Sequence, residues 1–131
     1  MKFRYKKLGR GLIRPVMPIT VSNGDESVRY EVLVDSGADM NLMNAEIAEI
    51  IGINIKSGRK GSVRGVTGQP EAYYTHKVSI TVGGHTCEVD VSFAERVGNE
   101  GYGILGQKGF FDLFKVKFDY SKEEIEVITN R

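Results

Sequence analysis

Leu-Val-Asp-Ser-Gly-Ala-Asp, residues 33–39, is the stretch that decides the fold of this chain. The apolar run Val32–Val34 predicts a buried strand, and the strand leads directly into a tight turn that carries the carboxylate of Asp35. Gly37 has no side chain, so the turn can be tight and a second backbone can come close to the carboxylate. A carboxylate at the end of an apolar strand is costly unless it is paired or used in chemistry. Asp35 is therefore the first candidate functional residue.

Alternating apolar and polar residues predict strands over most of the chain. Residues 78–82 and 87–93 alternate in this way, and Gly83-Gly84 between them suits the turn of a hairpin. Two further hairpins are predicted on the same grounds: 16–21 with 28–34 around a turn at 22–25, and 116–120 with 125–127 around a turn at 121–123. The sequence therefore predicts a compact, mainly β protein built as a closed barrel.

Helix signals are few. Asn44 can cap a short helix over Ala45–Ile51, Glu46 suits the positive end of its dipole, and Gly52 can take the left-handed exit. A second turn of helix is expected after Gly109. The prediction is one or two short helices beside the strands.

The composition is that of one ordinary globular domain. The chain has 131 residues, 40% apolar and 27% charged. Its longest apolar runs span three residues, far below the roughly 20 that a membrane-spanning helix needs. The basic amino terminus lacks the apolar stretch of a secretory signal, and the single Cys87 excludes an internal disulfide. We therefore expect a cytoplasmic protein without membrane contact.

Positive charge is concentrated at the amino terminus. The first 14 residues hold six Lys or Arg and no acid, which leaves 12 − 17 = −5 for the remainder. Such a segment can bind phosphate by releasing counterions. A solvated basic arm is the preferred interpretation, because the aromatic platforms and the reading helix of a nucleic-acid-binding module are missing. We expect an arm over residues 1–14 and one domain over 15–131, with no nucleic-acid partner.

The chemistry that suits Asp35 needs a second carboxylate. Two aspartates a few ångströms apart share one proton, because two like charges at that distance cannot both ionise. The ionised group can take a proton from water while the protonated group polarises a peptide carbonyl. Asp-Ser-Gly occurs once in the chain. If the chemistry uses two facing carboxylates, the second comes from another copy, and a homodimer is implied.

The turn 35–39, Asp-Ser-Gly-Ala-Asp, resembles the active-site turn of the retropepsin-like, single-lobed aspartic proteases. Ile104-Leu105-Gly106 resembles the apolar-apolar-Gly element that threads a ψ-shaped loop beside the catalytic turn in that family. Between them, 63–70 resembles the glycine-bearing flap hairpin. The resemblance covers roughly Pro15–Ile128. It implies the single-lobed acid-protease fold, a retropepsin-like closed β barrel.

The resemblance also implies a function. It is that of an aspartic endopeptidase in which Asp35 of each subunit activates one water, without metal or cofactor. Ser36 and Gly37 would support the turn and join the subunits. An extended peptide with apolar residues around the scissile bond is the expected substrate. The residues expected to bind it are Gly37, Ala38 and Asp39 of the turn and Gly65, Val66, Thr67 and Gly68 of the flap.

Three departures from the family pattern stand out. Ser36 replaces the more common Thr, the flap has fewer glycines than viral examples, and a full hairpin over Phe114–Ile128 follows the ψ-loop. The flap tip, with Val66 or Thr67 as candidates, and the dimer interface are therefore not transferred from the family.

Other interpretations were weighed. Residues 101–106 match the dinucleotide pattern G-x-G-x-x-G, but only 25 residues follow, too few for the required β-α-β unit. His85 and Cys87 share a strand face, yet a zinc site needs three or four ligands. Asp35 could also merely cap its own turn. A catalytically silent dimerisation or peptide-binding module, and a processing domain cut from a longer polyprotein, stay open beside the enzyme.

Overall fold

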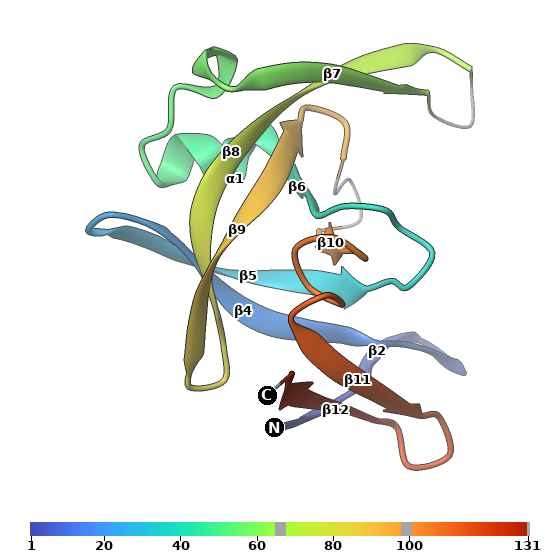
Figure 1. Ribbon diagram of the computed structural model, residues 1–131. Helices are drawn as coiled ribbons and strands as arrows, with labels where there is room; N and C mark the ends of the chain where they lie inside the picture. Colours follow the sequence, from blue (N-terminus) through green and yellow to red (C-terminus); the bar gives the residue numbers. More distant parts are fainter. Residues whose placement is uncertain (65–67, 98–100, 131) are drawn as a thin grey trace.

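The computed structural model describes residues 1–64, 68–97 and 101–130, and for Val63 and Arg64 only the backbone. Strands dominate these ranges, with one α-helix and one 3-10 helix (Figure 1). The elements are β1 Lys2–Arg4, β2 Lys6–Gly9, β3 Leu12–Arg14, β4 Val16–Asn23, β5 Glu26–Val34, β6 Leu42–Asn44, α1 Ala45–Ile50, η1 Ile55–Ser57, β7 Arg59–Arg64, β8 Pro70–Val82, β9 His85–Ala94, β10 Gly103–Leu105, β11 Phe114–Asp119 and β12 Glu124–Thr129. The mainly β prediction is confirmed.

The main sheet has seven strands in the order β4-β5-β10-β6-β9-β8-β7. Most neighbours are antiparallel, but β10 runs parallel to β5 and β6 runs parallel to β9. β4 also pairs with β8, which brings one end of the order back to the strand next to its other end. The short strand β10 lies between β5 and the segment that leads to β6 (Figure 1). Two strands distant in sequence, β5 and β10, are thereby brought together.

The predicted hairpins are present. Gly24 and Gly83 adopt φ of 59° and 60° in the β4–β5 and β8–β9 turns, values that an L side chain rarely adopts. The Asn44 side chain accepts the Glu46 N–H at 2.9 Å as the cap of α1, and Gly52 follows the helix at φ 77°.

The second helix is not where it was expected. Residues 109–113 form hydrogen-bonded turns rather than a helix, with the Phe114 N–H donating to the Phe110 carbonyl at 3.0 Å. The 3-10 helix at Ile55–Ser57 was not predicted. The Ile55 carbonyl contacts Nε2 of His76 in β8 at 2.6 Å. This contact comes from a distant strand and has no local sequence signal.

The basic segment 1–14 is folded into strands β1, β2 and β3. β1 pairs with β12 in a three-stranded sheet of order β1-β12-β11, so the two chain ends lie near each other (Figure 1). The amino-terminal ammonium donates to the Val127 carbonyl at 2.9 Å, and the Tyr5 N–H donates to the Glu123 carbonyl at 2.8 Å. Phe3 and Tyr5 pack against the core. Most of the charge of this segment therefore lies on a folded surface.

One continuous core joins the two sheets. Its largest fully buried side chains are those of Phe93, Phe110, Phe114, Met17 and Met43. The rings of Phe110 and Phe114 lie 5.0 Å apart between centroids and link the segment after β10 to the carboxyl-terminal hairpin. This packing fixes the start of β11 against the main sheet. No helix of the described residues is long and apolar enough to cross a membrane.

Candidate active site

The Asp-Ser-Gly turn is fixed by backbone hydrogen bonds from two strands. β5 and β10 pair in parallel, with Val34 opposite Leu105. The Asp35 N–H donates to the Leu105 carbonyl at 3.0 Å, and the Ala38 N–H donates to the Asp35 carbonyl at 3.1 Å. These bonds do not depend on side-chain rotamers, so the position of Asp35 follows from the sheet itself.

The carboxylate of Asp35 is half-buried and oriented by its own turn. Its Oδ1 accepts the Gly37 N–H at 2.9 Å. This is the bond expected of an aspartate that caps its own turn. A Cβ on Gly37 would lie 3.2 Å from the same oxygen and crowd it. Oδ2 has no hydrogen-bond partner in the described part of the chain. One oxygen is thus held in place while the other is left for a different partner.

Ile104-Leu105-Gly106 lies directly beside the turn. β10 is bonded to β5 on one side and to β6 on the other. Just after it, the Gln107 N–H donates to the Ala38 carbonyl at 2.8 Å and the Gln107 side-chain amide donates to the Ser36 carbonyl at 2.6 Å. A Cβ on Gly106 would stand 2.5 Å from the Met40 carbonyl oxygen, so only glycine fits this crossing. The structure brings together the two motifs that lie about 70 residues apart in the sequence.

Asn41 is a site residue that sequence reasoning missed. Its side chain is fully buried, its Oδ1 accepts the Gly106 N–H at 3.0 Å, and its Nδ2 donates to the Asp90 carbonyl at 3.2 Å. One amide thereby satisfies a donor of the ψ-loop and an acceptor of β9. The available signal is its spacing: Asn41 shares the strand face of buried Met43, so a polar side chain is directed into the core.

The residues expected to contact substrate fall into two groups. Ser36, Gly37 and Asp39 are exposed on the turn and Ala38 is half-buried there. Gly65, Val66 and Thr67 lie outside the described residues. Gly68 is described and precedes β8 with φ 77°. The predicted flap corresponds to the β7–β8 hairpin, in which Gly61 pairs with Tyr73 and lies under its ring.

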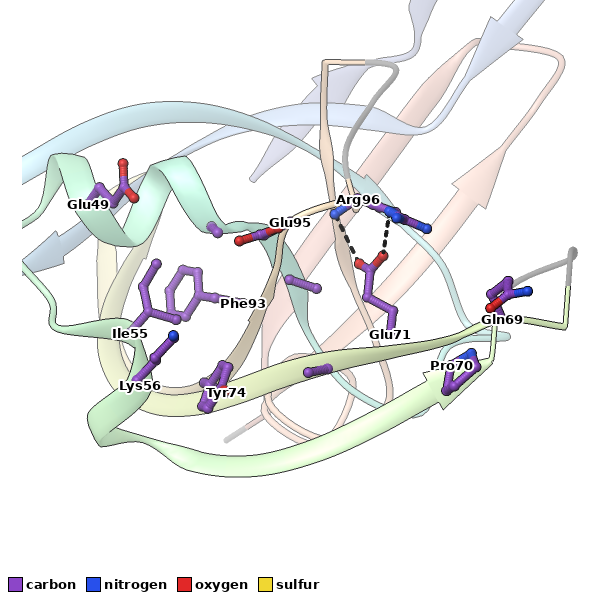
Figure 2. A pocket seen from close by; sticks show the side chains of 13 residues that line it. Glu49, Ile55, Lys56, Gln69, Pro70, Glu71, Tyr74, Phe93, Glu95 and Arg96 are labelled. Atoms are coloured by element: carbon purple, nitrogen blue, oxygen red, sulfur yellow. Dashed lines mark hydrogen bonds and ion pairs between the residues drawn. The ribbon is translucent and has the colours of Figure 1, made fainter.

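A cavity of about 480 Å³ is lined by residues 69–72 and 74 on the β8 side of this hairpin, and Asp35 is not among its lining residues. Figure 2 shows that α1, η1, β8 and the end of β9 contribute side chains to it, with Ile55 and Phe93 next to each other on one side and Glu71 and Arg96 on the other. Glu71 and Arg96 are joined across 25 residues of sequence. Neither residue carries a local signal that would have identified the contact.

Titratable groups near the turn are few. Burial raises the pKa of Tyr30 in β5. Its ring packs closely on Gly103, where an added Cβ would lie 2.7 Å from Cε2 of Tyr30. Burial also raises the pKa of the Cys87 thiol on β9, away from the turn. Within residues 1–64, 68–97 and 101–130, no three His, Cys, Asp or Glu side chains are grouped to hold a metal ion.

The arrangement of the Asp-Ser-Gly turn beside the ψ-loop agrees with the protein family that the sequence matches. The model of the aspartyl protease family matches residues 17–108, which include the turn, the hairpin and the ψ-loop. The chain belongs to the aspartyl protease family. No curated protein matches the sequence significantly.

Solved structures place this aspartyl protease among retropepsin-like folds. A retropepsin-like aspartic protease from Rickettsia conorii superposes with a TM-score of 0.66 at 16% identity, covering 95% of this chain and 97% of the other. The retroviral protease-like domain of Ddi1 from Leishmania major gives 0.61 at 18% identity, covering 90% and 94%. The EIAV protease in complex with the inhibitor HBY-793 gives 0.54 at 22% identity, covering 72% and 82%. The predicted family resemblance is confirmed, and these similarities establish the fold.

Proposed function

We propose that this protein is an aspartic endopeptidase whose active site forms between two copies of the chain. The observation that carries the proposal is the oriented carboxylate of Asp35. It stands on a turn bonded to the ψ-loop, with one oxygen engaged and the other without a partner in the described chain. Since the chain contributes one such carboxylate, a second copy would supply the other.

The two aspartates act as one acid–base unit. They share a proton, so one is ionised and the other is neutral. The ionised Asp35 takes a proton from water, whose oxygen attacks the peptide carbonyl carbon while the neutral partner donates a hydrogen bond to the carbonyl oxygen. Collapse of the tetrahedral intermediate breaks the C–N bond, and a carboxyl proton passes to the leaving nitrogen. Carboxylates and water balance the reaction without a metal or cofactor.

The substrate is an extended peptide. It would lie along the turn, where Gly37 allows close approach and Asp39 is exposed to accept peptide N–H groups, with the β7–β8 hairpin on its other side. The Ser36 hydroxyl would bond across the dimer axis and hold the two turns together.

Three further expectations belong to the same proposal. The β4–β8 pairing supports a closed barrel, because it joins the sheet across its ends. We also retain division of the chain at residue 14 and a cytoplasmic setting as predictions.

The alternative is a silent module that keeps the fold and dimerises or binds peptides without cleaving them. The Gly37 N–H bond to the Asp35 carboxylate is compatible with it, because a residue that only caps a turn would make the same bond. A domain of Ddi1 among the similar structures keeps this alternative in view, since fold does not fix function.

A peptide library separates the two. Wild-type protein and Asp35→Asn are incubated with it from about pH 4 to about pH 8, and products are read by mass spectrometry. The asparagine keeps an oxygen for the Gly37 N–H, so the turn stays folded. Cleavage by the wild type alone supports the enzyme. Silence of both variants with a proven dimer supports the module, and equal cleavage by both contradicts the proposed mechanism.

A further inference from the structure

The β7–β8 hairpin extends beyond the sheet that supports it. The β8–β9 ladder runs from Val82↔His85 and ends at Tyr74↔Phe93. Residues 70–73 of β8 pair only with β7 in the described chain. A two-stranded ribbon by itself is marginally stable in water. Some other contact must therefore fix the direction of this part of the hairpin.

Glu71 supplies that contact. Its Oε1 accepts the backbone N–H of Arg96 at 2.9 Å, and its Oε2 lies 3.7 Å from Nε of the same residue (Figure 2). The Glu71 side chain is 20% exposed, whereas that of Arg96 is 77% exposed. A charge-assisted bond to a backbone N–H is stronger than an exposed ion pair, which contributes little. The hairpin is therefore held mainly by the Glu71 carboxylate on the Arg96 amide.

The segment that Glu71 holds is fastened to the sheet from its other side. Nδ2 of Asn44 donates to the Val97 carbonyl at 2.7 Å and to the Glu95 carbonyl at 3.2 Å. Asn44 ends β6, and β6 is bonded to β10, whose Leu105 carbonyl accepts the Asp35 N–H. A continuous set of hydrogen bonds thus runs from Glu71 to the catalytic turn.

We infer that Glu71 is a positioning residue that fixes the β7–β8 hairpin relative to Asp35 and thereby sets substrate affinity. The inference rests on the proposed peptidase function. Glu71 acts through Arg96 and the segment 95–97, and it takes no part in the proton transfers. Loss of the contact leaves the dyad intact, so substrate binding weakens while the chemical step is kept.

Four variants isolate the bond. Glu71→Ala removes both contacts, and Glu71→Gln keeps an oxygen that can accept the Arg96 N–H. Arg96→Ala removes the exposed guanidinium but retains the backbone N–H. Lys77→Ala is the matched control, because it breaks an exposed ion pair of 3.6 Å between Lys77 of β8 and Asp90 of β9, outside the projecting part.

Steady-state kinetics on a peptide cleaved by the wild type, together with amide hydrogen exchange of residues 71–73 and 95–97, tests the inference. We expect Glu71→Ala to raise KM roughly tenfold with kcat within about twofold, and to speed exchange in both segments. The Glu71→Gln, Arg96→Ala and Lys77→Ala variants should stay within about threefold of the wild-type KM. A purely structural role would lower the melting temperature without this split between KM and kcat.

The two proposals fail in different ways. If the wild type cleaves and Glu71→Ala shows unchanged KM and exchange, the positioning role is wrong and the peptidase stands. If the wild type cleaves nothing, the function as proposed fails. In that case equal exchange in Glu71→Ala and Lys77→Ala also overturns the structural part of the inference, and selectively faster exchange in Glu71→Ala supports it.

Discussion

The Asp-Ser-Gly turn and the β7–β8 hairpin are held by different means. The turn is bonded through backbone groups to β10 and the ψ-loop, with buried Asn41 beneath it. The projecting part of the hairpin depends on one carboxylate at a surface-accessible position. This difference fits the proposed function, in which the carboxylate of Asp35 needs a fixed place and the hairpin that holds substrate is positioned without being locked. The comparison predicts large effects of change in the first region and graded effects in the second.

The largest effect is expected where backbone meets backbone. In Gly106→Ala the added Cβ would stand 2.5 Å from the Met40 carbonyl oxygen and 2.7 Å from that of Ala38, so the ψ-loop must move. We expect cleavage to fall below detection and unfolding free energy to drop by about 3 kcal/mol or more, measured by denaturant titration.

Gly84→Ala is the control for that substitution. Nothing lies within 4 Å of a Cβ there, so its stability should change by less than about 1 kcal/mol. Equal losses in the two variants would mean that the ψ-loop is not the constrained region.

The next effect concerns the buried amide. Asn41→Ala leaves the Gly106 N–H and the Asp90 carbonyl without their partner inside the core. We expect an unfolding free energy lower by about 2–4 kcal/mol, with faster hydrogen exchange at the ψ-loop. A loss under about 0.5 kcal/mol would show that Asn41 does not support the turn.

A smaller effect is expected where the two regions join. Asn44→Asp keeps the oxygen that caps α1 but replaces the donor to the Glu95 and Val97 carbonyls with a negative charge. We expect exchange in 95–97 to rise and stability to fall by about 1 kcal/mol, while exchange around Asp35 is unchanged. Faster exchange in the Asp-Ser-Gly turn as well would mean that the two regions are one unit.

The smallest effect lies outside both regions and serves as a reference. The Ser121 hydroxyl donates to Asp119 at 2.8 Å and, with the Lys122 N–H, holds the pKa of that carboxyl below its usual value. A lowered folded-state pKa stabilises the fold above the unfolded pKa, and this contribution is lost as pH falls through the folded value. Ser121→Ala should raise the pKa of Asp119, followed by NMR titration, and leave cleavage unchanged. An unchanged pKa would contradict the role of Ser121.

Local signals explain what the sequence predicted. The hairpins, the Asn44 cap and the Asp-Ser-Gly turn each depend on neighbouring residues, and the structure has them where expected. The meeting of β5 with β10 followed from the family resemblance, since a three-residue strand has too little periodicity to be paired by pattern alone.

Long-range contacts explain what was missed. The charge of residues 1–14 predicts a basic arm, and no local pattern shows that the backbone of β1 pairs with that of β12, where Lys2 lies opposite Glu126. The bond from Glu71 to Arg96 joins two polar residues 25 positions apart, and either one alone suggests a solvated surface. Tertiary contacts decide such positions, and local patterns do not show them.

The most direct test of the account mixes wild-type chains with Asp35→Asn chains. At a fixed wild-type concentration, increasing amounts of Asp35→Asn are added and peptide cleavage is measured after the subunits have exchanged. In the proposed mechanism one active site takes an Asp35 from each of two chains, so we predict that excess Asp35→Asn draws wild-type chains into inactive mixed dimers and suppresses cleavage almost completely. Undiminished cleavage with demonstrated mixed dimers would show that one chain suffices, and would contradict an active site shared across the dimer.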